Sequence, residues 1–406
     1  EEWYYPRVKH VVRNAAGRRV EVESEWILHR RYTLTSDVAL GTGAYGTVVS
    51  AFDNLTGLNV AIKRVERTFS KVMEGKRLLR EIKLLRRLQH QSIIGLVDIM
   101  KLPSIDEHVY LVFELMDTDL QWVIKSGQPI SEEHIQFFMH QLLLGLLHLK
   151  QNNIIHRDLK PGNILVNEDC ALKICDFGLA RCCDVDPGDG LLSLEKTQYV
   201  VTRWYRAPEL LLQSRYYDFA VDMWAAGCIF AELFTLRPLI PGTSHVHQLS
   251  LIMQALGKPS DEEVAHFASE GAMDWLRRQP QMEPSDIASV IPEASEEAKD
   301  LLRGMLAFNP ADRITVEEAL DHPFFLTSQL EMAEPEFYEI DFSFDSEVQT
   351  IEDIKARIWE EMVFLHPELD PDLLPPEVLG NQGFPGGGEN GYGYEGGGGE
   401  SMEMDM

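Results

Sequence analysis

Residues 156–163 read His-Arg-Asp-Leu-Lys-Pro-Gly-Asn, and thirteen positions after Asn163 the chain reads Asp176-Phe-Gly. Asp158, inside the first segment, can accept a proton from an attacking hydroxyl group. Asn163 and Asp176 offer oxygen ligands to Mg²⁺. Either segment alone could arise by chance. The two together, in this order and at this spacing, predict a site for phosphoryl transfer from ATP.

A glycine-rich segment lies upstream, as a loop that covers the phosphates of ATP would require. The segment reads Gly41-Thr-Gly43-Ala44-Tyr-Gly46-Thr-Val48. Because glycines let backbone N–H groups approach phosphates closely, the five numbered residues are candidate ATP contacts. A GxGxxG pattern alone could instead open a dinucleotide-binding unit, but that unit needs a helix next. The β-branched run at residues 47–52 predicts a strand, which favours the ATP loop.

A lysine and a glutamate extend the nucleotide site. Residues 60–63, Val-Ala-Ile-Lys, predict a strand that brings Lys63 to the α- and β-phosphates, with Ala61 as a further ATP contact. Glu81 lies eighteen residues later, in segment 76–88, where apolar residues recur at helical spacing. Taken alone, this segment would be interpreted as a surface helix whose charged side chains form salt bridges in solvent. Beside the other motifs, Glu81 is the expected ion-pair partner of Lys63, and the whole set predicts a protein kinase.

Composition sets the broad class. With 406 residues the chain is longer than one ordinary domain, and its 45% hydrophobic content can supply a large core. No apolar run reaches the roughly 18 residues that span a bilayer, and no signal peptide is recognisable, so we expect no membrane partner. Because the chain begins with Glu1, we expect a processed, trimmed or incomplete product. Five cysteines without metal-ligand spacing indicate a reducing compartment, the cytoplasm or the nucleus.

Charge is distributed unevenly. Residues 327–406 carry a net charge of −18 out of −28 for the chain. Nucleic-acid binding is not expected, because it needs a basic face for phosphate contacts. The acidic C-terminal part favours basic partner peptides, although a solvating tail is the simpler alternative.

The predicted fold is α+β and bilobal, the protein kinase fold, with a small antiparallel β-sheet lobe containing one helix and a large, mainly helical lobe. From the start of the chain we expect an N-terminal extension (1–31), the kinase domain (32–326), a C-terminal extension (327–376) and an acidic, glycine-rich tail (377–406). Within the domain the parts are the small lobe (32–112), the hinge (113–119) and the large lobe (120–326). The tail cannot bury enough apolar surface to offset the entropy of ordering, so we expect disorder there.

The substrate side indicates the kind of kinase. Lys160, two residues after Asp158, is typical of Ser/Thr kinases, where it can steady the transferred γ-phosphoryl group. The Ala-Pro-Glu triplet that ends at Glu209 closes the activation segment. A buried Glu209 needs a charge partner, for which Arg313 is the candidate. Asp222 resembles the helix aspartate that holds the backbone of the catalytic loop.

From about residue 32 to about residue 367 the chain resembles the mitogen-activated protein kinases of the extracellular-signal-regulated type. The most specific segment, residues 197–209, reads Thr-Gln-Tyr-Val-Val-Thr-Arg-Trp-Tyr-Arg-Ala-Pro-Glu. The family carries a Thr-x-Tyr dual phosphorylation site at this position. The middle residue here is Gln198, where the closest branch has glutamate.

Three further segments resemble this family. Residues 115–120 are similar to its hinge, residues 238–260 to an insert that it shares with cyclin-dependent relatives, and residues 350–361 to a C-terminal helix that packs back onto the small lobe. Thr350 and Asp353 are expected to cap that helix. Acids at Glu331, Glu334 and Glu336 follow the last domain helix, where the family binds basic docking peptides. The resemblance implies a monomer that phosphorylates Ser/Thr-Pro sites in proteins and is controlled by dual-specificity kinases and phosphatases.

The resemblance also implies roles for individual residues. Asn163 and Asp176 would bind Mg²⁺, and Thr202 would bond Asp158 and Lys160. Glu114 and Met116 would offer backbone groups to adenine, and Asp119 would reach the ribose. Phosphorylation is expected at Thr197 and Tyr199. The expected phosphate anchors are Arg80, Arg157 and Arg181 for Thr197, and Arg203 and Arg206 for Tyr199. Each phosphate adds about two negative charges and three acceptors, which can order a loop on converging arginines.

Two alternatives remain open from the sequence. A cyclin-dependent-like kinase fits the bulky Phe113 at the gatekeeper position, but it leaves the Thr-Gln-Tyr motif and the C-terminal extension unexplained. A pseudokinase scaffold would use the acidic tail and large surface for binding. A scaffold is expected to lack at least one of the catalytic residues, whereas all five are present: Lys63, Glu81, Asp158, Asn163 and Asp176.

Overall fold

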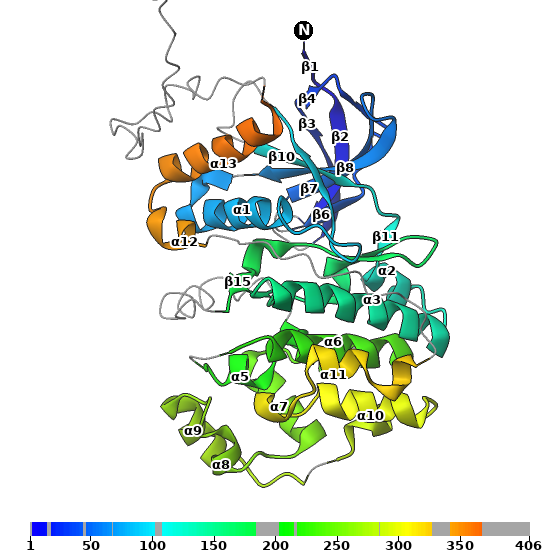
Figure 1. Ribbon diagram of the computed structural model, residues 1–406, viewed down its shortest axis with the longest axis vertical. Helices are drawn as coiled ribbons and strands as arrows, with labels where there is room; N and C mark the ends of the chain where they lie inside the picture. The colour runs from blue at the N-terminus through cyan, green and yellow to red at the C-terminus, as the bar shows by residue number, and fades with distance from the viewer. Residues whose placement is uncertain are drawn as a thin grey trace, which may run out of the picture.

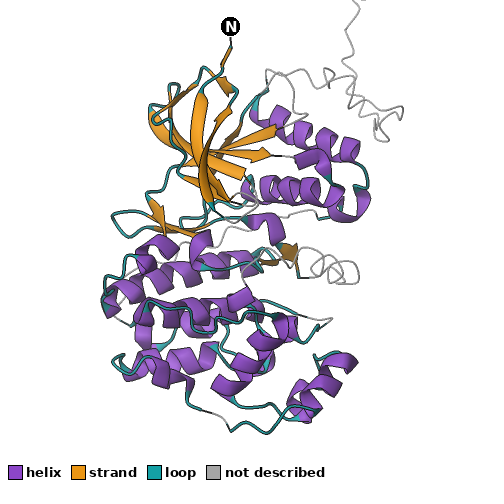
Figure 2. Ribbon diagram, turned by 180° about the vertical axis from the view of Figure 1, so that it is seen from behind, coloured by secondary structure: helices purple, strands orange, loops and turns teal. Residues whose placement is uncertain are grey.

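The computed structural model describes residues 2–13, 18–43, 46–66, 68–101, 108–183, 203–214, 217–283, 285–326 and 342–367. Several residues and segments discussed above lie outside these ranges: Ala44, Thr197, Gln198, Tyr199, Thr202, Glu331, Glu334, Glu336 and the tail 377–406. Figure 1 shows two lobes, one above the other. Seen from behind in Figure 2, most strands gather in the upper lobe, and the lower lobe is nearly all helical. The predicted bilobal α+β fold is thus confirmed.

An antiparallel sheet forms the small lobe, in the order β5-β7-β8-β10-β9, with β6 paired to β7. Its strands are β5 (Tyr32–Leu34), β6 (Gly41–Gly43), β7 (Gly46–Asp53), β8 (Leu58–Glu66), β9 (Leu96–Ile99) and β10 (His108–Glu114). Burial alternates along β8, where Val60 and Ile62 are buried. Since side chains alternate between the faces of a strand, Ala61 and Lys63 share the opposite face.

Helix α1 (Val72–Leu85) follows β8 after a short 3-10 turn, η1 (Thr68–Ser70). Its buried residues include Leu78, Ile82 and Leu85, as the helical spacing in the sequence predicts. The helix begins at Val72, four residues before the predicted start at residue 76. The added turn contains Gly75, which lies against the C-terminal extension. That distant contact could not be recognised from local periodicity.

The large lobe is built from helices around α6. Its α-helices are α2 (Leu120–Lys125), α3 (Glu132–Gln151), α5 (Pro208–Leu211), α6 (Ala220–Thr235), α7 (His245–Leu256), α8 (Asp261–Val264), α9 (Glu270–Arg277), α10 (Glu296–Met305) and α11 (Val316–Leu320). Its 3-10 turns are η5 (Arg203–Tyr205), η6 (Ile287–Val290), η7 (Pro310–Asp312) and η8 (Pro323–Phe325). Nearly every residue of α6 is buried, and α3 and α10 pack against it. A helix that is apolar on all sides belongs at the centre of a lobe.

Short strand pairs hold the motif segments of the large lobe. Strand β13 (Ile164–Val166) lies between β11 (Thr118–Asp119) and β14 (Leu172–Ile174), and β12 (Ile154–Ile155) pairs with β15 (Arg181–Cys182). The segment 156–163 connects β12 to β13 and ends in a 3-10 turn, η2 (Pro161–Asn163). The segment at Asp176 connects β14 to β15 through η3 (Phe177–Leu179). These pairings fix both ends of the two segments that carry the predicted chemistry.

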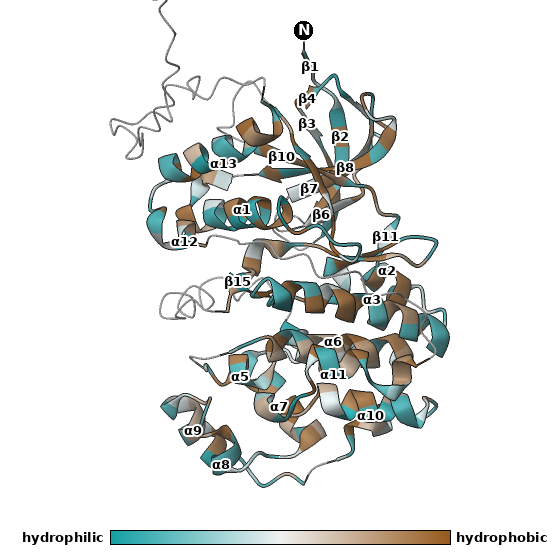
Figure 3. Ribbon diagram, viewed as in Figure 1, coloured by the Kyte–Doolittle hydropathy of each residue, from teal (hydrophilic) through white to brown (hydrophobic). Residues whose placement is uncertain are grey.

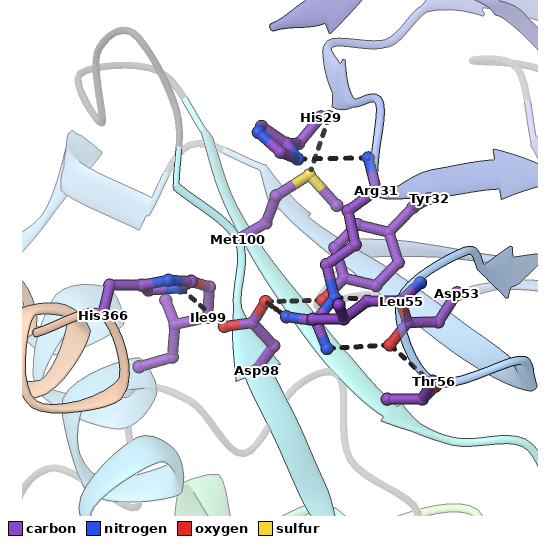
Figure 4. Close-up of polar contacts among 10 residues, drawn as sticks. All are labelled: His29, Arg31, Tyr32, Asp53, Leu55, Thr56, Asp98, Ile99, Met100 and His366. Carbon is purple, nitrogen blue, oxygen red and sulfur yellow. Dashed lines mark hydrogen bonds and ion pairs between the residues drawn. The ribbon is translucent and has the colours of Figure 1, made fainter. Parts of the chain in front are cut away.

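Residues before Tyr32 add two small strand pairs to the small lobe. Strands β2 (Arg7–Arg13) and β3 (Arg19–Glu25) form a hairpin, and β1 (Trp3–Tyr4) pairs with β4 (Leu28–His29). A polar network shown in Figure 4 joins this extension to the sheet. Arg31 donates to Asp53 at 2.7 Å and to Asp98 at 3.2 Å, and the Tyr32 hydroxyl donates to Asp98 at 2.5 Å.

The C-terminal extension returns to the small lobe as α12 (Phe344–Glu347) and α13 (Ile351–Leu365). Helix α13 lies beside α1 in Figure 1, and both helices carry hydrophilic as well as hydrophobic turns in Figure 3. Thr350 and Asp353 form the predicted capping box. Ile354 is fully buried, and a Cβ atom built on Gly75 would lie 2.9 Å from its Cδ1 atom. The glycine in α1 therefore permits close packing of the two helices.

In the described part of the chain, no helix combines the length and the apolar character that crossing a membrane requires.

Candidate active site

The segment 156–163, which carries Asp158 and is called the catalytic loop from here on, is held by Asp222 from helix α6. Its carboxylate accepts the backbone N–H of His156 at 2.7 Å and that of Arg157 at 2.9 Å. Arg157 adopts the left-handed region, with φ +66°, which is costly for a residue with a side chain. Burial raises the pKa of Asp222, opposed by the nearby His156 and the two N–H donors. Asp222 thus has the role that its resemblance to a loop-holding aspartate predicts.

Asp158 lies in this loop with two partners on one carboxylate oxygen. Lys160 Nζ is 2.5 Å from Asp158 Oδ2, and Asn163 Nδ2 donates to the same oxygen at 3.0 Å. Asn163 Nδ2 also donates to the backbone carbonyl of Asp158 at 2.8 Å. Burial raises the pKa of Asp158, while the charge of Lys160 acts in the opposite direction. The carboxylate is therefore oriented, and it is a stronger base than an exposed aspartate.

Lys63 on β8 and Glu81 on α1 form an ion pair, with 2.7 Å between Lys63 Nζ and Glu81 Oε1. Both side chains are largely buried. Burial alone would lower the pKa of Lys63, but the carboxylates of Glu81 and Asp176 outweigh it and raise the pKa. Lys63 is therefore charged near neutral pH. A small cavity beside the pair is also lined by Asp176 and Gly178, so the ion pair and the Asp-Phe-Gly segment lie together.

Asp176 adopts a left-handed backbone conformation, with φ 65° and ψ 73°. Aspartate tolerates this region better than most residues, although at some cost. A Cβ atom on Gly178 would lie 3.4 Å from Asp176 Oδ1, so the carboxylate lies against this glycine. Within the described ranges, no hydrogen bond or ion pair to the Asp176 carboxylate oxygens is found.

A divalent metal ion fits these donors. Asp176 offers a carboxylate, and Asn163 uses its amide nitrogen on Asp158, which leaves its amide oxygen as a ligand. Hard cations such as Mg²⁺ take oxygen ligands of this kind, often only one or two from the protein, with phosphate and water completing the shell. Among the described residues there is no group of three or more histidine, cysteine or acidic side chains that could hold an ion by itself.

The glycine-rich loop lies on β6 and β7, where Gly41 pairs with Val48 and Gly43 with Gly46. Gly46 has φ +138°, and a Cβ atom there would lie 2.0 Å from the carbonyl oxygen of Arg64. Only glycine is compatible with this backbone position. The four described candidates of this loop are thus brought to one hairpin, beside the strand that carries Lys63.

The hinge candidates have contacts that the sequence did not indicate. The Glu114 carboxylate accepts the backbone N–H of Gly95 at 2.6 Å and pairs with Lys173 at 3.0 Å, which ties the end of β10 to β14. Met116 is buried. Asp119 caps helix α2 by accepting the backbone N–H of Trp122 at 2.7 Å, so one of its oxygens already has a partner. Burial raises the pKa of Asp119, and that backbone N–H opposes the rise.

The three arginines expected to anchor phospho-Thr197 lie near one another. Arg80 donates to the Gly178 carbonyl at 2.7 Å, and Arg157 donates to the Leu179 carbonyl at 2.8 Å. Burial and then the charges of Arg80 and Arg157 lower the pKa of Arg181 to about 9. Arg80 and Arg181 both contact Asp345 of the C-terminal extension. Asp345 was not anticipated, because nothing in its local sequence separates it from the other acids around it.

Two further arginines were expected at phospho-Tyr199. Arg203 donates to the Thr243 carbonyl at 3.2 Å on the exposed surface. Burial lowers the pKa of Arg206, and the charge of Asp158 opposes this effect. Arg206 and Asp158 line one small pocket, so Arg206 lies at the catalytic loop.

A buried ion pair supports the end of the activation segment. Arg313 donates to Glu209 through two nitrogens, at 2.8 and 3.2 Å, and both side chains are almost fully buried. Arg313 also donates to the Ala220 carbonyl at the start of α6 at 2.6 Å. The predicted partnership of Glu209 and Arg313 is therefore present, and it ties α5 to the lobe centre.

The fold and this arrangement of side chains define a protein kinase. A family model described as protein kinase domain matches residues 34–325. Such a domain uses ATP and a divalent metal ion.

The relatives refine this class. Extracellular signal-regulated kinase 1 of Dictyostelium discoideum is 44% identical over 364 residues, which cover 89% of this chain and 67% of that protein. Mitogen-activated protein kinase 5 of Oryza sativa is 46% identical over 334 residues, covering 81% of this chain and 88% of that protein. Mitogen-activated protein kinase 6 of Arabidopsis thaliana is 45% identical over 333 residues, covering 81% and 82%. The chain belongs to the mitogen-activated protein kinases, which are Ser/Thr protein kinases.

Proposed function

We propose that the chain is a Mg²⁺-dependent, proline-directed Ser/Thr kinase that is switched on by phosphorylation of Thr197 and Tyr199. The observation that carries the catalytic part is the preformed ion pair of Lys63 and Glu81, 2.7 Å apart, beside the Asp-Phe-Gly segment. The proline preference and the double phosphorylation rest on the resemblance of residues 197–209 to the family. The proposal places the chain in intracellular signalling, in the cytoplasm or the nucleus.

The reaction transfers the γ-phosphoryl group of ATP to a protein hydroxyl. The hydroxyl oxygen bonds to the γ-phosphorus, the bond from that phosphorus to the β–γ bridging oxygen breaks, and ADP leaves. Asp158 accepts the hydroxyl proton at its carboxylate. Because Lys160 and Asn163 both contact Oδ2, the Oδ1 atom is the one available to the substrate. Since the transition state is loose, positioning and charge neutralisation supply most of the rate.

Lys63 contacts the α- and β-phosphates in this mechanism, and Glu81 keeps it oriented. Asn163 and Asp176 would hold Mg²⁺, and the ion would supply neutralisation of the phosphate charge. Lys160 would support the γ-phosphate, and its contact with Asp158 at 2.5 Å is in keeping with this role. Thr202 is assigned a bond to Asp158 and Lys160 by the resemblance alone. The backbone of Glu114 and Met116, with Asp119, forms the adenosine end of the site.

The proposed function also implies protein partners. A dual-specificity kinase would phosphorylate Thr197 and Tyr199, and phosphatases would reverse this step. Basic docking peptides would bind the acidic region after residue 326, in keeping with its net negative charge. Competition between free basic peptides and a protein substrate, weakened by added salt, is the expected signature.

One experiment tests the proposal. The purified chain is incubated with Mg·ATP and two peptides that differ only in Pro or Ala after the target Ser, before and after treatment with a dual-specificity activating kinase. Asp158→Asn is the control, and chelation followed by Mg²⁺ addition tests the metal. We expect transfer to the Pro peptide that rises with phosphate on Thr197 and Tyr199 and is absent from the control. Transfer equal to the control in every state would leave only a scaffold role.

A further inference from the structure

We propose that Asp345, in helix α12, is a positioning residue that holds α1 and Glu81 in place for catalysis before the activation segment is phosphorylated. The carboxylate of Asp345 takes the place that the phosphate of Thr197 is expected to take. The inference rests on the proposed function, because it assumes the roles given above to the Lys63–Glu81 pair and to the anchoring arginines.

The contact between Asp345 and Arg80 is a two-point charged hydrogen bond. Arg80 Nη2 lies 2.6 Å from Asp345 Oδ1, and Arg80 Nε lies 3.3 Å from Oδ2. The Arg80 side chain is 3% exposed and the Asp345 side chain 20% exposed, so water competes little for either. Bidentate arginine–carboxylate pairs are among the strongest polar contacts in proteins, and phosphate uses the same geometry.

Arg80 connects this carboxylate to the catalytic residues. It precedes Glu81 on α1, and its third nitrogen, Nη1, donates to the Gly178 carbonyl at 2.7 Å. One guanidinium group therefore joins α12, α1 and the Asp-Phe-Gly segment. Lys76, one turn earlier on α1, donates to the backbone carbonyl of Asp345 at 2.6 Å, which fixes the position of α12 as well.

Asp345 also neutralises a cluster of like charges. Burial lowers the pKa of Arg80, as does the charge of Arg157, and Asp345 acts in the opposite direction. Arg181 Nη1 is 3.5 Å from Asp345 Oδ2. Among the described residues, Asp345 is the acid that forms ion pairs with both Arg80 and Arg181. Without an acid at this place the buried arginines would repel one another and move α1.

The ion pair of Lys63 with Glu81 is present in the structure together with the ion pair of Arg80 with Asp345. The arrangement predicts that the unphosphorylated chain depends on Asp345 and that the phosphorylated chain depends on it much less. A phosphate on Thr197 would bring its own charge and acceptors to the same arginines.

The test compares Asp345→Asn with the unchanged chain, each dephosphorylated or phosphorylated on Thr197 and Tyr199. Glu347→Gln is the matched control, because this acid lies on the same helix, is 56% exposed, and is 3.7 Å from Arg357 rather than near Arg80. Asp345→Glu keeps the charge and is expected to restore part of the activity. The readouts are kcat/KM on a Ser-Pro peptide and hydrogen exchange of residues 72–85.

We expect Asp345→Asn to lower kcat/KM about tenfold in the unphosphorylated chain and less than about threefold in the phosphorylated one, in keeping with loss of a charged hydrogen bond. Exchange in α1 should rise only in the unphosphorylated variant. An equal loss in both states would make Asp345 merely structural, and a gain of activity would make it a competitor of the phosphate; either result overturns the inference.

Asp158→Asn separates the two proposals. If the unchanged chain transfers no more phosphate than Asp158→Asn in either state, the proposed function fails. Hydrogen exchange then decides the inference by itself, because protection of α1 by Asp345 does not require turnover. Equal α1 exchange in the unphosphorylated chain and its Asp345→Asn variant would overturn the inference even if catalysis is confirmed.

Discussion

At the scale of single residues, the pH profile of the reaction should report Asp158. A general base acts in its deprotonated form, so kcat/KM falls as pH drops through the pKa of Asp158, which burial raises. Because the charge of Lys160 opposes the rise in that pKa, Lys160→Met should move the acid limb of the profile to higher pH. The measurement is kcat/KM from pH 5 to 9.

The matched control is Lys299→Met, since Lys299 pairs with the exposed Glu296 on the surface of α10. A lower kcat with an unmoved acid limb in Lys160→Met would contradict the assignment of that limb to Asp158.

His90 should make stability depend on pH. Its ring stacks on that of His148, with centroids 4.8 Å apart, and burial and then the charge of His148 lower its pKa from 6.5 to about 4. The unfolded chain therefore binds a proton more readily than the folded chain between these values. The contribution of neutral His90 to the free energy of unfolding is fully present above pH 6.5. As pH falls toward 4 this contribution is lost, which lowers the free energy of unfolding by at most about 3 kcal/mol.

Urea unfolding at pH 7.5 and pH 5 measures this effect. His90→Asn keeps an acceptor for the Ser92 N–H, which His90 Nδ1 accepts at 3.1 Å, and it should make the pH dependence shallower. His134→Asn, at the exposed start of α3, should leave the dependence as it is. If the two variants have the same pH dependence, the His90 ring does not titrate as described.

At the scale of elements, the packing of α13 on α1 should depend on Ile354. This side chain is fully buried against Gly75. Ile354→Ala should lower the free energy of unfolding by about 2–4 kcal/mol, because it removes buried methyl groups and leaves a cavity. Glu352→Ala, on the exposed side of the same helix, should cost less than about 1 kcal/mol. A similar small loss in both variants would mean that α13 does not pack tightly in solution.

At the scale of the whole molecule, Asp98 on β9 joins the N-terminal extension and the end of α13 to the sheet. It accepts from Arg31 at 3.2 Å and from Tyr32 at 2.5 Å, and His366 Nε2 lies 2.7 Å from its other oxygen (Figure 4). The bonds of Asp98 with Tyr32, His366 and Arg31 outweigh its burial and lower its pKa. Asp98→Asn should therefore lower the free energy of unfolding by about 2–4 kcal/mol.

Asp37→Asn is the control for Asp98→Asn. Asp37 pairs with Lys9 at 2.9 Å on the surface, and surface pairs contribute at most about 1 kcal/mol. Thermal unfolding followed by circular dichroism compares the two variants. Equal shifts of the midpoint would contradict the description of Asp98 as the point where the N-terminal extension, β9 and the end of α13 meet.

Local sequence patterns were sufficient to predict the class of fold and the segments that carry the site residues. Asp158, Lys160 and Asn163 lie within six positions of one another, so their spacing alone brings them into one loop. Strand and helix periodicity predicted the elements that carry Lys63 and Glu81. The capping box of α13 could be predicted because Thr350 and Asp353 are three residues apart. Such features depend on residues that are close together in the sequence, so they can be predicted from the sequence directly.

Which distant charges form ion pairs depends on how the elements pack in three dimensions. Asp345 contacts Arg80, which lies 265 positions earlier in the chain. Lys173 pairs with Glu114, and Asp98 pairs with both Arg31 and His366, which are far apart in the sequence. No periodicity or motif specifies these partners. The contacts of Asp345 and Asp98 follow from how α12, α13 and the N-terminal strands pack onto the small lobe, and the contact of Lys173 follows from how β14 lies against the end of β10. Burial makes an unpaired charge costly at these places, so acids and bases that meet there must pair.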